Sequence, residues 1–183
     1  SDSQRWAAVE AHAALQRATP YAGLAWRSIG PVLQGGRVVD IENIPGNPHG
    51  FYVAYASGGV WKTTDNGMTF TPLSDQLASI VTGDIAVDPN APQRLWIGSG
   101  EPNSSRSSYG GLGVFRSEDG GKTFRNMGLA DTDRIARVWV DPADGSHVCV
   151  AALGKLYSTG GSRGIFCTRD DGASWKQTLR PQG

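Results

Sequence analysis

The sequence lacks the features that mark membrane-spanning and nucleic-acid-binding proteins. Its apolar runs fall far short of the roughly 18 residues that a membrane-spanning helix needs. It also has no excess of either charge, because 17 basic residues balance 17 acidic ones. Proteins that bind nucleic acid or an anionic membrane surface usually carry an excess of positive charge. We therefore expect no membrane span and no nucleic-acid partner.

Motifs for metals, cofactors and activated nucleophiles are missing as well. The three histidines, His12, His49 and His147, fall in a predicted helix, a turn and a strand start, and they show no metal-ligand spacing. There is no nucleophile elbow, phosphate loop or dinucleotide fingerprint. The sequence therefore predicts neither a metal nor a cofactor.

Cysteine is scarce, with only Cys149 and Cys167. Both are expected on consecutive strands, where a disulfide is geometrically feasible. We nevertheless expect two buried free thiols, because cysteines in strands usually behave as small hydrophobic residues.

Glycine is abundant, at 25 of 183 residues, and there are 10 prolines. That glycine content is about twice the usual level and favours many tight turns. Only residues 4–17 are rich in helix formers, with Ser3 as a candidate cap and Pro20 blocking continuation. We predict one helix with its linker over residues 1–20, outside a fold made of short strands.

One eight-residue motif occurs three times. Its frame is [Ser/Thr]-x-Asp-x-Gly-x-[Ser/Thr]-[Phe/Trp], and the copies are residues 63–70, 117–124 and 168–175. The aspartates of this Asp motif lie 54 and then 51 residues apart. A repeat of this length is typical of solenoids, arrays and propellers.

Each Asp motif belongs to a unit of four short strands separated by turn residues. In the first unit the strands are expected at 36–45, 51–56, 60–64 and from Phe70 onward. Four strands per unit of about 50 residues is typical of a β-propeller blade. We predict an all-β fold with three four-stranded antiparallel blades, which span residues 32–78, 79–130 and 131–183.

A further strand is predicted over residues 21–31. Trp26-Arg-Ser-Ile-Gly has the form that follows each Asp motif, but no Asp motif precedes it. It is expected to be the outer strand that closes the last blade. Three blades cannot close a ring, since propellers have about four to eight. We therefore predict an incomplete propeller that needs the remaining blades of a longer chain or other copies of this chain.

The Asp motif is interpreted as a structural staple of the turn between the third and fourth strands. Its aspartate can accept hydrogen bonds from its own turn, and its glycine permits a positive φ. A carboxylate triad for catalysis or metal binding is the alternative, but the copies lie on separate turns. The motif residues are Asp65, Gly67, Phe70, Asp119, Gly121, Phe124, Asp170, Gly172 and Trp175.

These motifs resemble the Asp-box, or BNR, repeat of sialidases, sortilin-type receptors, xyloglucanases and a photosystem assembly factor. The phrases at 26–31, 35–38, 56–67, 98–103 and 151–154 are similar to the N-terminal part of bacterial sortilin-like (VPS10-like) propeller proteins, often labelled glycosyl hydrolases. The resemblance covers about residues 24–176. It implies a propeller that works outside the cytoplasm, as a secreted, periplasmic or cell-surface protein.

Candidate binding residues lie in loops between strands and at strand starts. The second-blade loop combines an acid, an amide, a cation and an aromatic ring, and loops on a rigid scaffold often carry function. Alternatively, Glu101 and Arg106 pair and simply fold this loop. The candidates are Arg37, Glu101, Asn103, Arg106, Tyr109, Arg134, Lys155 and Arg163.

Two departures from the enzymes that this chain resembles argue against catalysis by these blades. The Phe/Tyr-Arg-Ile/Leu-Pro signature of sialidases is replaced by residues 36–39, Gly-Arg-Val-Val. Ala56-Ser57 stands where xyloglucanases carry a catalytic aspartate. The favoured function is therefore a non-catalytic binding or scaffold module for a protein, peptide or glycan. The alternatives are part of a secreted glycoside hydrolase, with Glu101 as candidate acid and other acids outside this chain, or an accessory subunit of a larger complex.

Overall fold

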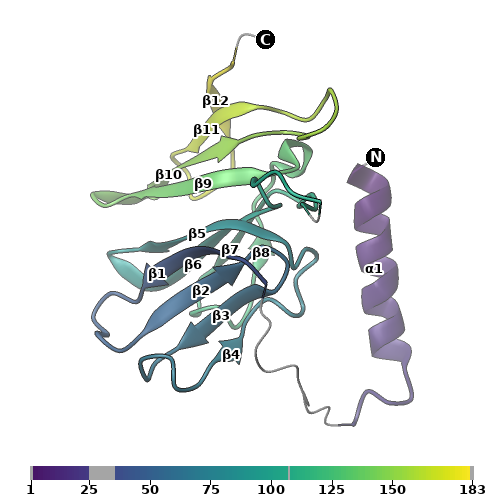
Figure 1. The fold of residues 1–183 in the computed structure, drawn as a ribbon, viewed down its shortest axis with the longest axis vertical. Coiled ribbons are helices and arrows are strands. Elements are labelled where there is room, and N and C mark those ends of the chain that lie inside the picture. Colours follow the sequence, from purple (N-terminus) through teal and green to yellow (C-terminus); the bar gives the residue numbers. More distant parts are fainter. Residues whose placement is uncertain (1, 25–35, 107, 182–183) are drawn as a thin grey trace. The chain divides into compact units, whose positions relative to one another are not determined.

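The computed structural model describes residues 2–24, 36–106 and 108–181. The chain divides into two compact units, with the boundary between residues 35 and 36. The first unit contains α1 (Asp2–Ala18), as predicted for this segment (Figure 1). Residues 20–23 form a turn, and residues 25–31 of the predicted closing strand lie outside the described residues. None of the helices in the described ranges has the length and apolarity that crossing a bilayer requires.

The second unit consists of three four-stranded antiparallel sheets, as the repeat predicts. Within each sheet the strands follow one another in chain order, which is the arrangement of a propeller blade. The strands of the first blade are β1 (Val38–Asn43), β2 (Phe51–Tyr55), β3 (Gly59–Thr63) and β4 (Thr71–Pro72). Those of the second are β5 (Thr82–Asp88), β6 (Ala91–Ser99), β7 (Val114–Ser117) and β8 (Arg125–Asn126). A short 3-10 helix, Ala130–Thr132, precedes the third blade, which contains β9 (Ile135–Asp141), β10 (Asp144–Ala152), β11 (Gly164–Thr168) and β12 (Lys176–Leu179).

The blades stack through the apolar faces of their sheets. Alternation of side chains along β9 and β10 turns Val138 and Val150 toward the second blade, and both are buried. This side contributes most of the core cluster between blades two and three, which contains Ala86, Trp96, Val114, Ile135, Val138, Val140, Val148, Val150, Ala152 and Phe166.

The last aromatic residue of the third Asp motif links two blades. Trp175 meets the buried Trp96 of β6 edge-to-face, with 6.4 Å between ring centroids. Its indole N–H donates to the carbonyl oxygen of Met127 over 2.7 Å. The Arg116 guanidinium lies over the Trp96 ring, 5.2 Å from its centroid. Trp175 therefore secures the third blade to the second.

A second contact, which repeats from blade to blade, joins the innermost strands β1, β5 and β9. The Asp40 carboxylate of β1 accepts a hydrogen bond from the backbone N–H of Ile85 in β5 over 3.2 Å. One blade later, Asp84 of β5 accepts from the backbone N–H of Val138 in β9 over 2.7 Å. The third position of β9 is Arg137, whose guanidinium donates to Asp84 over 2.9 Å. The same strand position therefore connects each inner strand to the next.

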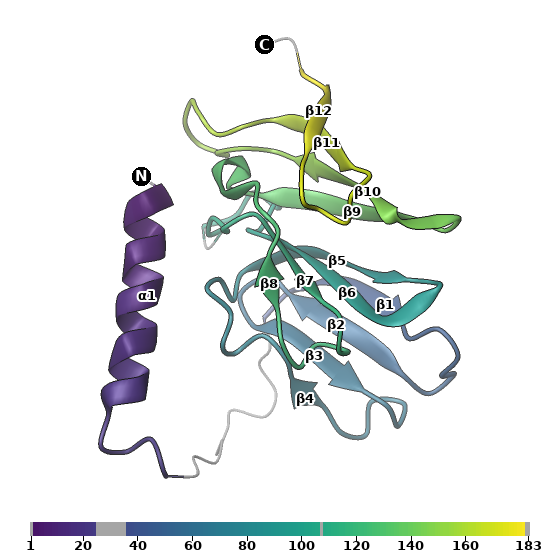
Figure 2. The same cartoon turned by 180° about the vertical axis from the view of Figure 1, so that it is seen from behind.

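The three sheets do not close into a ring. The second blade lies between the first and the third (Figures 1 and 2). The outer faces of the two flanking blades expose apolar side chains, with Ile41 56% and Trp139 49% accessible. Such faces are normally covered by neighbouring blades. The unit is thus an incomplete propeller, and its exposed outer faces fit contact with further blades.

The prediction of free thiols was wrong, because Cys149 and Cys167 form a disulfide. They face each other directly across β10 and β11, with 4.1 Å between their Cα atoms. Both lie on the outer face of the third blade, opposite the core that Val150 enters, and both are half-buried. They therefore do not act as the buried hydrophobic residues that were expected.

Candidate functional site

The Asp motif uses its carboxylate entirely within its own turn. Asp65 Oδ1 accepts hydrogen bonds from the Thr63 hydroxyl over 2.7 Å and from the Thr69 N–H over 2.9 Å. Its Oδ2 accepts from the Thr69 hydroxyl over 2.6 Å. Asp119 and Asp170 repeat the same three bonds.

These hydrogen bonds also hold the three carboxylates ionised. Donation by the Thr69 side chain is the main reason why the pKa of Asp65 falls to about 2. Ser174 lowers the pKa of Asp170 to about 2 in the same way, and Thr123 holds the pKa of Asp119 well below its ordinary value. Because each carboxylate serves its own turn, the three do not form one site.

The acid of the second-blade loop (residues 100–113, between β6 and β7) is a buried partner of an arginine. Glu101 is fully buried, and its Oε1 accepts from Arg37 Nε over 3.0 Å. Its Oε2 accepts from Arg37 Nη2. Arg37 stands just before β1, so the pair joins blade one to the loop of blade two. The alternative that Glu101 pairs with Arg106 is therefore wrong.

Arg134 holds the same loop from the side of the third blade. It stands just before β9, pairs with Asp133 and donates from Nη2 to the carbonyl oxygen of Ser108 over 3.0 Å. Its buried Nε finds no partner among the described residues. Arg37 and Arg134 therefore hold the second-blade loop at two different points.

The exposed candidates form the outer surface of the loops. Asn103, Arg106 and Tyr109 are exposed, with Tyr109 58% accessible. The third-blade loop (residues 153–163, between β10 and β11) reaches this surface through Tyr157. Its hydroxyl donates to the Ser105 carbonyl oxygen over 2.9 Å and lies 2.9 Å from the Ser104 hydroxyl. The loops of blades two and three thus form one continuous surface.

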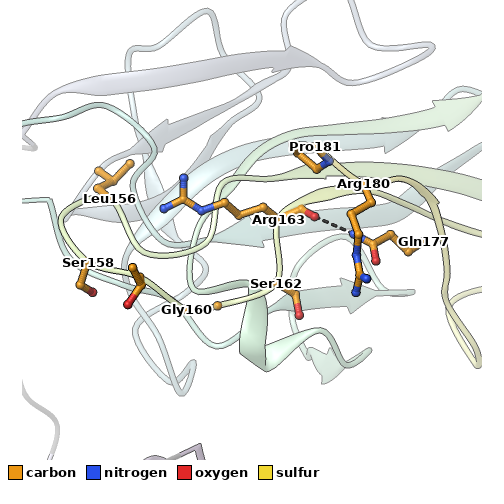
Figure 3. Close-up of a pocket in the computed structure, with 10 residues that line it drawn as sticks. Leu156, Ser158, Gly160, Ser162, Arg163, Gln177, Arg180 and Pro181 are labelled. Atoms are coloured by element: carbon orange, nitrogen blue, oxygen red, sulfur yellow. Dashed lines mark hydrogen bonds between the residues drawn. The ribbon is translucent and has the colours of Figure 1, made fainter. Parts of the chain in front are cut away.

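The remaining candidates, Lys155 and Arg163, belong to the third-blade loop. Arg163 borders an open pocket of about 960 Å³ with Ser158, Ser162 and Arg180 (Figure 3). Its carbonyl oxygen accepts from Gln177 Nε2 over 2.6 Å, and its Nη2 donates to the Lys155 carbonyl oxygen. The guanidinium of Arg163 therefore gives this pocket positive charge.

Sequence reasoning missed the carboxylates of the innermost strands. Asp84 is buried, and burial raises its pKa to about 7, although hydrogen bonds from Val138 and Arg137 oppose the shift. Burial and the Asp40 charge also raise the pKa of Glu42. The available signal was an aspartate at the third position of both β1 and β5.

The three consecutive blades define a segment of a β-propeller. No protein-family model matches the chain. It is 28% identical over 131 residues to a xyloglucanase of a Paenibacillus species, covering 70% of this chain but 12% of that protein. The chain thus spans about an eighth of the length of that relative.

Solved structures show the same fold. An ancestral GH74 enzyme aligns with a TM-score of 0.65 and 21% identity, over 84% of this chain and 19% of its own. The GH74 xyloglucanase of Xanthomonas campestris gives 0.60 and 23%, over 84% and 22% of the two chains. A structure of YCF48 bound to a D1 peptide gives 0.53 and 15%, over 79% and 41%.

Proposed function

We propose that these blades are part of a glycoside-hydrolase-type propeller and bind a polysaccharide on the loop surface of blades two and three. The observation that carries the proposal is the similarity to a xyloglucanase over 131 residues. In this proposal the propeller works outside the cytoplasm, where plant and microbial polysaccharides are found.

The site geometry favours binding over catalysis by these particular residues. Glycosidases generally need two carboxylates on either side of the scissile bond, about 5–9.5 Å apart. Glu101 is the only acid in the second-blade loop, and it is buried beneath Arg37. Ala56-Ser57 offers no carboxylate at the xyloglucanase-like position. Any hydrolysis by the whole protein would therefore use acids outside this segment.

The surface chemistry suits sugar rings. Tyr109 and Tyr157 are 58% and 67% exposed, and flat aromatic faces pack against the apolar face of a pyranose. The Asn103 amide, which is also exposed, offers both donors and an acceptor for hydroxyl groups. These three side chains are the proposed contacts.

Calorimetric titration with xyloglucan oligosaccharides tests this proposal. We expect Tyr109→Ala and Tyr157→Ala each to weaken binding about fivefold, the equivalent of about 1 kcal/mol. Met68→Ala is the matched control, since Met68 is 85% exposed on an Asp-motif turn. Binding that both tyrosine variants leave unchanged, or the absence of binding by the folded protein, would refute the loop surface as a glycan site.

Hydrolysis is tested separately by reducing-sugar release. If the protein cleaves xyloglucan, Glu101→Gln should leave most of the rate, because the glutamine can still accept from Arg37 and hold the loop. A loss of 10³-fold or more, on the order of what a general acid or base contributes, would make Glu101 catalytic and overturn this part of the proposal.

A sortilin-like propeller that binds a protein or peptide is the second candidate, including a role as an accessory subunit. Arg106, Lys155 and the Arg163 pocket would suit an acidic peptide. Its support is the likeness to a propeller solved with a bound peptide. Tighter binding of an acidic peptide than of any oligosaccharide, lost in Arg163→Ala but kept in Tyr109→Ala, would favour it over the glycan proposal.

A further inference from the structure

The outer face of the third blade gathers three side chains that can ligate a metal. His147 and Cys149 lie two residues apart on β10 and so share a face, and Cys167 lies directly opposite Cys149 on β11. Their ligand atoms all lie within 4.8 Å of one another. His147 Nε2 is 3.7 Å from Cys149 Sγ.

The histidine is already held in the orientation that a metal site needs. Asp141 Oδ2 lies 3.0 Å from His147 Nδ1, and an ionised carboxylate can only accept. Nδ1 therefore carries the proton, and Nε2 keeps its lone pair on the side of the sulfurs. Trp139 meets the imidazole edge-to-face, 5.6 Å between centroids, and limits its rotation. A carboxylate that fixes the tautomer of a ligating histidine is a common feature of zinc sites.

We propose that reduction of the Cys149–Cys167 disulfide turns this cluster into a binding site for Zn²⁺ or a similar thiophilic divalent ion. The ligands are the two thiolates and His147 Nε2. A dithiol reductant supplies two electrons and two protons, which break the S–S bond into two thiols, and it becomes a cyclic disulfide. Each thiol then releases its proton when it binds the metal.

The distances suit tetrahedral coordination. Zn–S bonds of about 2.3 Å and Zn–N bonds of about 2.0 Å at a tetrahedral angle place a sulfur and a nitrogen ligand about 3.5 Å apart. The separation of His147 Nε2 from Cys149 Sγ is already 3.7 Å. The short distance between the cysteine Cα atoms, 4.1 Å, keeps Cys167 within reach once the sulfurs part. Only side-chain rotation of the cysteines is required.

The fourth coordination position is open to solvent in this arrangement. Both cysteines are half-buried, and a pocket of about 340 Å³ lies beside Cys167. A reductant can therefore approach the disulfide, and water can complete the coordination, as in zinc sites with three protein ligands. The oxidised form has no thiolate to offer, so metal binding is gated by the redox state. This site is independent of the proposed glycan surface.

Titration of the whole chain with Co²⁺, followed by displacement with Zn²⁺, tests the proposal. The protein is reduced with a dithiol, the reductant is removed under anaerobic conditions, and the reduced protein is compared with the oxidised form. We expect one equivalent of Co²⁺ with thiolate-to-metal charge-transfer absorption in the reduced protein only. His147→Ala should weaken Zn²⁺ binding at least 10-fold, and Asp141→Asn by about 10-fold. His49→Ala, an exposed histidine on another blade, should have no effect.

Three results would overturn the proposal. The first is equal metal binding by the oxidised protein. The second is unchanged affinity in His147→Ala, which would leave only a pair of thiols. The third is no binding by a reduced protein that circular dichroism shows to be folded. Reduced protein alkylated at both cysteines is the negative control, because it has no thiolate to offer and should bind no metal.

Discussion

Asp84 Oδ2 in β5 lies 2.7 Å from the backbone nitrogen of Val138 in β9 and accepts its hydrogen bond. This contact ties the innermost strand of one blade to that of the next. Because Asp84 is 2% exposed, its carboxylate has almost no contact with water. This contact between blades two and three is therefore sensitive to protonation of Asp84.

The first prediction concerns pH. Burial raises the pKa of Asp84 to about 7, against about 3.9 in the unfolded chain. Between these values the folded state holds a proton that the unfolded chain has released. The proton on Asp84 therefore stabilises the folded state fully below about pH 4, and this contribution is lost as the pH rises through about 7. Asp84→Asn should remove this dependence, since its amide oxygen can still accept from Val138.

Urea unfolding at about pH 5 and about pH 8 measures this effect. Relative to Asp84→Asn, the wild-type free energy of unfolding should fall by a few kcal/mol between the two, at about 1.4 kcal/mol per unit of pKa difference. If the free energies of unfolding of wild type and Asp84→Asn change in parallel with pH, protonation of Asp84 does not control the contact between blades two and three.

The second prediction concerns the Asp-motif staple. Asp170→Ala removes the acceptor of three hydrogen bonds from Thr168 and Ser174, whereas Asp170→Asn keeps one oxygen. Urea midpoints at neutral pH should fall from wild type to the asparagine variant and then to the alanine variant. Because the pKa of Asp170 is lowered to about 2, its stabilisation is present above about pH 4 and lost as the pH falls toward 2.

The difference between wild type and Asp170→Asn should therefore shrink in acid. Asp75→Ala is the control, since Asp75 is an exposed aspartate outside the motif. An effect of Asp75→Ala as large as that of Asp170→Ala would contradict a special role for the motif.

The third prediction concerns the buried ion pair that anchors the second-blade loop. Arg37→Met leaves the buried Glu101 carboxylate without its cation and should cost about 3 kcal/mol, at the low end for such pairs because the Arg37 side chain is 46% exposed. Glu101→Gln should cost less, and the double variant should recover much of the loss. A double-mutant cycle in urea measures the coupling, and strictly additive effects would argue against it.

The fourth prediction concerns the disulfide. Its cysteines are 18 residues apart, and closing a loop of this length stabilises a protein by about 3 kcal/mol in the chain-entropy model. Replacing both cysteines by alanine should lower the free energy of unfolding by about that amount. A change below about 0.5 kcal/mol, the range of ordinary surface substitutions, would mean that the bond contributes nothing to stability.

The fifth prediction concerns the uncovered outer faces. Ile41 and Trp139 are about half exposed on the two flanking blades, so the isolated chain should self-associate. Light scattering should show species larger than a monomer, and Ile41→Lys combined with Trp139→Lys should shift the population toward monomer. A monodisperse wild-type monomer that unfolds cooperatively would contradict the need for further blades.

Most of the fold could be predicted from local pattern. The helix α1 and the four-strand units around each Asp motif depend on neighbouring residues, and the three copies of the motif support one another. The functional surface was harder to predict. Tyr109 and Asn103 were identified as loop residues, but the true partner of Glu101 lies 64 residues away in another blade.

The sequence alone therefore determined the number of blades, their strand order and the turns that end them, because strand alternation and turn chemistry act over a few residues. The tertiary structure decided which charged groups are partners and which face each cysteine occupies. Arg37 meets Glu101, and His147 meets Cys149 and Cys167, only after strands are paired and blades stacked. Burial and pairing of charge depend on these long-range contacts, which no local pattern in a single sequence encodes.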